Sequence, residues 1–222
     1  MLQQYDFHKR NFSVGWQLIH IDVLLDDAIK YENVSFIFYA ALEARNILEK
    51  TEFDLILMST DETQWDEVLA LAKGKNGLNR GNNKYKALKF KYQSFSEALT
   101  KVIMDFSLKL YDYRASEQLQ SQLADYIHIY TKTPDELKFS SDYVQRGVCI
   151  INETISFIKK YYVVQDEGYV CGLLNFNTLS KPLKDEFEKW KNSVSEDVES
   201  LYLKIKEIND TQSGGAKAVL VV

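Results

Sequence analysis

Apolar side chains recur at intervals of three and four residues in the last quarter of this chain. The run comprises Leu183, Phe187, Trp190, Val194, Val198, Leu201, Ile205 and Ile208. An α-helix has about 3.6 residues per turn, so this spacing places the whole run on one helical face. We predict a single long amphipathic helix here, long enough to pack along a partner helix in the manner of a coiled coil.

The rest of the chain also favours helices. It contains only two prolines and nine glycines among 222 residues, too few for the many turns of a β-sandwich or a β-barrel. Residues 34–58 are apolar on nearly every side, which is typical of a central helix covered by its neighbours. Residues 13–30 are predicted to form a helix that buries the stripe Trp16, Ile19, Val23, Leu24 and Ile29. The expected fold class is therefore all-α, a multi-helix up-down bundle.

Three short patterns predict where further helices begin. Residues 59–62 and 94–97 have the form of a capping box, in which a serine and a glutamate satisfy backbone amides at a helix start. Residues 133–136 combine an N-cap threonine with a proline at the first helical position, so a helix is predicted to begin there. This helix, or its continuation after a break near Ser140, is expected to run to about Tyr162. Residues 163–177 are predicted to form either a hairpin or an ordered crossover, and we favour the crossover.

These elements predict three parts. Residues 1–178 form the helical bundle, residues 179–210 the long amphipathic helix, and residues 211–222 an apolar tail with a hinge at Gly214 and Gly215. The long helix packs either on the bundle or on a partner. Residues 216–222 are apolar enough to dock, either on a partner or back on their own bundle. The C-terminal helix and the tail are therefore the predicted contact region for a protein partner.

Charge and cysteine content exclude several classes of protein. A net charge of −5 excludes a generally basic nucleic-acid-binding protein, but not a local basic patch. The two cysteines and three histidines have no metal-ligand spacing, so neither a metal nor another cofactor is expected. No signal-peptide pattern and no run of about 18 apolar residues occurs, which predicts a cytoplasmic protein without membrane contact. The motifs of a phosphate-binding loop and of a serine-nucleophile elbow are also missing.

Residues 73–91 contain seven lysine or arginine residues and no acidic residue. Aromatic residues alternate with these cations, a combination that binds nucleic acid by neutralising phosphates and stacking on bases. The predicted nucleic-acid contacts are Lys73, Lys75, Arg80, Lys84 and Lys86. The alternative interpretation is a solvated glycine-rich loop that leads into the basic start of a helix.

Two other places bring titratable side chains together. On the helix predicted over residues 34–58, Arg45 shares one side with Glu49 and Glu52. We favour a structural ion pair there over an arginine positioned for phosphate. His128 follows Asp125 by three residues, a spacing that lets the carboxylate orient the imidazole for acid–base chemistry. The favoured alternative for His128 is a packed histidine near a helix end.

Residues 38–50 (FYAALEARNILEK) resemble the arginine-bearing core helix of HEPN-like bacterial proteins, and residues 123–128 (LADYIH) resemble a helix of their relatives. The resemblance implies an all-α fold, homodimers, and a setting in phage defence or toxin–antitoxin systems. Active members are metal-independent ribonucleases that use an arginine, the polar residue after it, and a histidine a few residues further on. Arg45 and Asn46 match the first two elements, but the motif histidine is missing, because positions 50–52 hold Lys-Thr-Glu.

These observations lead to three functional hypotheses. The first is a non-catalytic HEPN-like interaction module that dimerises and binds a protein partner. The second is an atypical metal-independent ribonuclease in which His128 comes from another helix to work with Arg45 and Asn46. The third is a nucleic-acid-binding module, with RNA as the partner, that uses the basic residues of 73–91.

Overall fold

The computed structural model describes residues 14–74, 76–103, 111–165, 168–171, 179–195 and 197–212. Within these ranges the chain forms nine α-helices, two short 3-10 helices and one β-hairpin, so the prediction of a helical protein is confirmed. The chain divides into two compact units, Met1–Lys50 with Asp112–Cys171, and Thr51–Tyr111 with Gly172–Val222. The predicted boundary at residue 178 does not coincide with this division.

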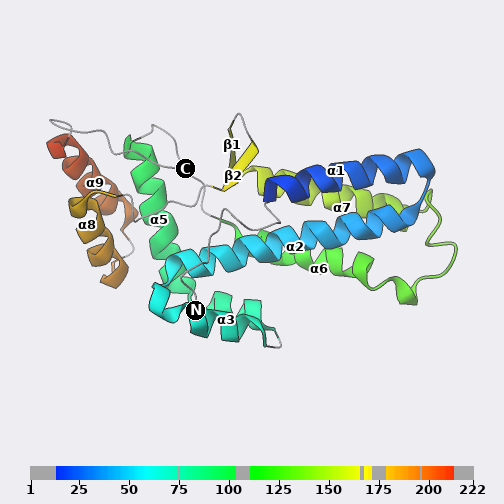
Figure 1. Cartoon of the computed structure of the whole chain (residues 1–222), viewed down its shortest axis with the longest axis horizontal. Coiled ribbons are helices and arrows are strands. Elements are labelled where there is room, and N and C mark those ends of the chain that lie inside the picture. The colour runs from blue at the N-terminus through cyan, green and yellow to red at the C-terminus, as the bar shows by residue number, and fades with distance from the viewer. Residues whose placement is uncertain are drawn as a thin grey trace. The chain divides into compact units, whose positions relative to one another are not determined.

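In the first unit, α1 (Val14–Tyr31) and α2 (Val34–Ser59) run in opposite directions and are joined by two residues (Figure 1). Glu32 has a left-handed conformation with φ 47°, and the Asn33 N–H donates to the Ala28 carbonyl at 3.2 Å, which ends α1. The Asn33 side chain accepts from the Ser35 N–H at 3.0 Å and starts α2. Residues 34–50 of α2 belong to this unit and residues 51–59 to the other.

α1 buries a different face from the predicted one. Its core side chains include Leu18, Ile21, Leu24, Leu25 and Ala28. Of the predicted stripe only Leu24 is buried, and the other four residues remain 48–62% exposed. Both sides of α1 are apolar, so periodicity identifies the helix without showing which side faces the core.

α6 (Tyr113–Ile127) and α7 (Asp142–Lys159) pack against each other in the same unit. A Cβ atom at Gly147 of α7 would lie 2.7 Å from Cε1 of Tyr126, so the missing side chain lets the two helices approach closely. The rings of Tyr126 and Tyr143 stack with their centroids 4.6 Å apart. These contacts fix the α6–α7 crossing.

The segment before α7 corrects one predicted helix start. Thr133 and Glu136 exchange the two hydrogen bonds of a capping box, at 2.8 and 3.4 Å, but only turns follow them. α7 begins at Asp142, where the Ser141 hydroxyl accepts from the Val144 N–H at 3.2 Å. The predicted helix start at Thr133 is therefore wrong, while the helix expected after a break near Ser140 is present as α7.

A hairpin follows α7. Strands β1 (Tyr162–Gln165) and β2 (Gly168–Cys171) pair antiparallel, with Tyr162 opposite Cys171. β1 contacts α7 and β2 contacts α1. The favoured prediction of a crossover is wrong for these residues, and the hairpin alternative is confirmed, while residues 172–177 lie outside the described ranges.

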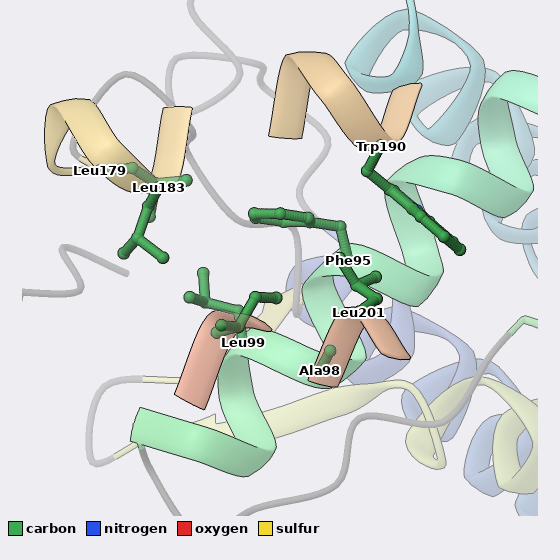
Figure 2. Packing of buried hydrophobic residues seen from close by; sticks show 8 residues of the cluster. Phe95, Ala98, Leu99, Leu179, Leu183, Trp190 and Leu201 are labelled. Atoms are coloured by element: carbon green, nitrogen blue, oxygen red, sulfur yellow. The ribbon is translucent and has the colours of Figure 1, made fainter. Parts of the chain in front are cut away.

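In the second unit, α3 (Trp65–Ala72) and α4 (Gly77–Lys84) pack together, and α5 (Lys86–Ile103) packs against α8 (Lys181–Asn192) and α9 (Val198–Gln212). Figure 2 shows the apolar cluster at which α5, α8 and α9 meet. It consists of Phe95, Ala98, Leu99, Leu179, Leu183, Trp190, Leu201 and Ile205. Each of these side chains is at most 7% exposed. This cluster is the core that joins α5 to the C-terminal helices.

The long C-terminal helix predicted over residues 179–210 is wrong as a single element, because it is broken between Asn192 and Val198. The Lys91 ammonium group lies 3.8 Å from the Trp190 ring centroid, and it donates to the Ser193 hydroxyl at 3.0 Å and to the Ser195 carbonyl. A cation at the C-terminal end of α8 stabilises that end. Both halves of the predicted apolar run, on α8 and on α9, therefore pack on α5 of the same unit.

Both serine-based capping boxes were also wrong. Ser94 and Ser96 lie inside α5, where their buried hydroxyls donate to the carbonyls of Phe90 (2.6 Å) and Tyr92 (2.9 Å). The Ser59 hydroxyl donates to the Ile56 carbonyl at 2.9 Å. Serine hydroxyls satisfied within a helix do not need to cap one. None of the helices among the described residues is long and apolar enough to cross a membrane.

Candidate functional site

Arg45 lies in the middle of α2 and is bound by a carboxylate. Its Nε donates to Oε1 of Glu49 at 2.7 Å, one helical turn later, which confirms the predicted ion pair. Glu52, the second predicted carboxylate, instead accepts from Nδ2 of Asn82 at 2.6 Å. Asn46 is exposed, and as the next residue along α2 it points about 100° away from Arg45.

His128 ends α6 and is exposed. Its ring approaches Tyr130, with centroids 6.3 Å apart. Among the described residues, no hydrogen bond or ion pair joins His128 to Asp125 or to Arg45. The described part of the chain thus does not assemble the predicted acid–base pair.

The basic residues of 73–91 divide into an exposed group and a buried group. Lys73, Arg80, Lys84 and Lys86 are exposed, and Lys75 lies outside the described residues. Lys84 pairs with Glu67 across α3 and α4. The hydrogen bond from Lys84 lowers the pKa of the Glu67 carboxyl, and the same bond raises the pKa of Lys84.

Lys89 and Lys91 point inward, at 3% and 6% exposure. Nζ of Lys89 donates to Oδ1 of Asn82 at 2.6 Å. Two of the interleaved aromatics, Tyr85 and Tyr92, are also buried, at 3% and 2% exposure. The predicted combination of surface cations with surface aromatics is therefore wrong for these residues, which form part of the core.

The outer side of the α1–α2 pair carries large apolar residues that are exposed. Trp16, Ile19 and Val23 of α1 are 48%, 59% and 50% exposed, and Tyr39 and Leu42 of α2 are 59% and 41% exposed. We call these five residues the α1–α2 face. Monomeric proteins rarely expose contiguous apolar patches of this kind without a partner.

A polar cluster joins the two helices beside this face. Nε2 of Gln17 donates to Oε2 of Glu43 at 3.2 Å, and Nδ1 of His20 lies 3.7 Å from Oε1 of Glu43. The rings of Trp16 and His20 lie 5.0 Å apart. Gln17 is only 4% exposed, and its Oε1 has no hydrogen-bond partner among the described residues. Sequence reasoning missed this cluster, because it becomes visible only once α1 and α2 are paired.

Helix geometry places both apolar stripes on the same side of the pair. Trp16 and Val23 lie next to His20 on the solvent side of α1, and Tyr39 and Leu42 lie on the solvent side of Glu43 on α2. Because α1 and α2 run antiparallel and face a common core, the solvent side of α1 and the solvent side of α2 lie next to each other on the surface. Asn46 continues the α2 stripe, one turn after Leu42.

The described residues contain no group of three or more His, Cys, Asp or Glu side chains that could hold a metal ion. Comparisons with protein-family models, with curated proteins and with solved structures found no match.

Proposed function

We propose that this chain is a non-catalytic helical interaction module of the HEPN-like type, that it forms a homodimer through the α1–α2 face, and that it serves a bacterial phage-defence or toxin–antitoxin system. The observation that carries the proposal is the α1–α2 face itself. Five large apolar side chains, each 41–59% exposed, lie on one side of two packed helices. Burying them against a second copy removes that area from water, which is the main driving force of association.

The chemistry near the predicted catalytic residues supports a non-catalytic role. The Arg45 guanidinium is held by Glu49, so an incoming phosphate would have to compete with a carboxylate 2.7 Å away. His128 lies at the end of α6 and contacts Tyr130 rather than Arg45. General acid–base chemistry on a phosphodiester requires both groups at one reacting centre.

The experiment is a sedimentation-velocity series over protein concentration. The unaltered chain is expected to dimerise, and Val23→Glu and Leu42→Glu to be monomeric, because a charge in a desolvated apolar interface is unfavourable. Ile29→Glu is the matched control on the same helix, since Ile29 is 62% exposed but lies outside the face. A monomeric unaltered chain, or a Val23→Glu dimer as tight as the original, would contradict the proposal.

A second candidate function is nucleic-acid binding by the second unit. Lys73, Arg80 and Lys86 are exposed and make no ion pair with a described residue. The buried positions of Lys89 and Lys91 reduce the number of surface cations. Fluorescence anisotropy with labelled single-stranded RNA tests this function, and binding that falls steeply with added salt and with Arg80→Gln would support it.

A further inference from the structure

A hollow of about 300 Å³ lies between α6 and α7 in the first unit, close to the start of α7. Its lining combines aromatic rings, one isoleucine and four charged side chains. The hollow lies on a different helix pair from the α1–α2 face, so the inference below does not depend on the proposed dimer. A volume near this value is at the lower end of the range for small-molecule sites.

One wall of the hollow is rigid and uncharged. The Tyr126 hydroxyl donates to the Tyr143 carbonyl at 3.1 Å, and the Tyr143 hydroxyl donates to the Asp125 carbonyl at 2.6 Å. Burial raises the pKa of Tyr143 to about 12 and also raises the pKa of Tyr126, so both phenols stay protonated at neutral pH. The stacked rings and their two hydrogen bonds hold this wall in one arrangement before any ligand arrives.

Of the four charged side chains at the hollow, only Lys132 makes an ion pair with another described residue. The Lys132 ammonium group lies 3.7 Å from the Glu136 carboxylate and 4.5 Å from the Tyr143 ring centroid, so it already has partners. Arg146, Asp125 and Asp142 make no ion pair with any residue in the described ranges. Arg146 and Asp125 act in opposite directions on the pKa of Tyr126, which places both charges near its ring. One guanidinium and two carboxylates therefore line the same small space, none of them in an ion pair with another described residue.

We propose that this hollow binds a small zwitterion, of the size and charge pattern of a free α-amino acid. The ligand's carboxylate pairs with the Arg146 guanidinium, which offers several N–H donors to two oxygens. Its ammonium group lies against the carboxylates of Asp125 and Asp142, and its side chain against Tyr143 and Ile150. A phosphate or another anion would face two carboxylates, and a simple cation would face Arg146. A ligand with both charges avoids each conflict.

The test uses the full chain and the set of proteinogenic L-amino acids in a thermal-shift panel. The amino acid that raises the melting temperature most is then titrated by calorimetry, together with its methyl ester and its N-acetyl derivative. The ester lacks the carboxylate and the N-acetyl compound lacks the ammonium group. Each is expected to bind at least about tenfold more weakly than the free amino acid.

Two variants and one control locate the binding. Arg146→Gln and Asp125→Asn are expected to weaken binding at least about tenfold. Arg114→Gln removes an exposed arginine of α6 that does not line the hollow, and it is expected to bind like the unaltered chain. A panel without any thermal shift would overturn the proposal. So would an ester that binds as well as the free acid, or a shift that survives in Arg146→Gln.

Discussion

The core of the second unit contains three buried polar side chains that are linked by hydrogen bonds. Glu52, Asn82 and Lys89 are 0%, 7% and 3% exposed, and Asn82 links the other two through hydrogen bonds of 2.6 Å on each side. α2, α4 and α5 each contribute one member. In the sequence, Lys89 looks like one more cation of a basic stretch, because Glu52, the carboxylate to which Asn82 links it, lies 37 positions away. A buried hydrogen-bond network of this kind fixes the relative position of three helices.

Removing the side-chain amide of Asn82 should therefore destabilise the chain. Asn82→Ala leaves an ammonium group and a carboxylate oxygen each short of a buried partner, and we expect a loss of about 3 kcal/mol in the free energy of unfolding. Urea denaturation followed by circular dichroism measures it. Asn83→Ala, at the exposed neighbouring position of α4, is expected to stay within about 0.5 kcal/mol. Equal effects of the two substitutions would contradict the role of the network.

Tyrosine burial in the first unit predicts a sensitivity to alkali. The pKa of Tyr143 is about 12 in the folded chain against about 10 when unfolded, and the pKa values of Tyr126 and Tyr161 are also raised, chiefly by burial. Folding thus favours the protonated phenols. The contribution of Tyr143 is fully present below about pH 10 and is lost as the pH rises through about 12, and the raised pKa values of Tyr126 and Tyr161 act in the same direction.

We expect the free energy of unfolding, measured by urea titration at a series of pH values, to fall over that interval. Tyr143→Phe should lower stability at neutral pH, because it removes the hydrogen bond to the Asp125 carbonyl. It should also reduce the alkaline slope, since one titrating phenol is gone. An identical slope in the variant and the unaltered chain would show that Tyr143 does not carry the effect.

At the scale of elements, periodicity identified helices better than it identified their ends or their buried sides. The apolar period runs from Leu183 to Ile208 without a fault, yet the chain turns between α8 and α9. Val194 belongs to the pattern but is fully exposed, and Lys91, which holds the break, is about a hundred positions away in the sequence. Local patterns contain no information about such distant partners. The Gln17–His20–Glu43 cluster was missed for the same reason.

Two members of that apolar run should respond differently to truncation. Leu201 is 2% exposed in the α5–α8–α9 core, so Leu201→Ala is expected to cost about 3 kcal/mol. Val194→Ala, at a position outside the core, is expected to stay within about 0.5 kcal/mol. Thermal and urea denaturation of both variants measure the difference. If the helix were continuous and buried Val194, the two substitutions would lower the free energy of unfolding by comparable amounts.

At the scale of the whole molecule, the two units are interleaved along the chain. The first takes Met1–Lys50 and Asp112–Cys171, and the second takes Thr51–Tyr111 and Gly172–Val222. The division of the sequence into consecutive parts assumed that neighbours along the chain belong together. Nothing in composition marks the crossing point at residues 50 and 51, because it lies inside α2, whose helical pattern continues from Val34 to Ser59.

The predicted bundle, residues 1–178, therefore should not behave as a complete domain. Removal of α8 and α9 takes Leu183, Trp190, Leu201 and Ile205 away from the apolar side of α5. We expect the 1–178 fragment to bind a hydrophobic dye and to lose cooperative unfolding of its second unit. The 1–212 fragment keeps every member of that cluster and is expected to match the full chain. A 1–178 fragment that unfolds as sharply as the full chain would contradict the assignment of these helices to one core.

The order in which a ribosome makes this chain gives the interleaving a further consequence. Residues 51–111 emerge before the whole of residues 112–171, yet their partners α8 and α9 are made only after residue 171. During that delay the apolar side of α5 has nothing to pack against, a situation in which nascent chains attract chaperones and aggregate. The synthesis of α8 and α9 thus sets the moment at which the apolar side of α5 can first be buried.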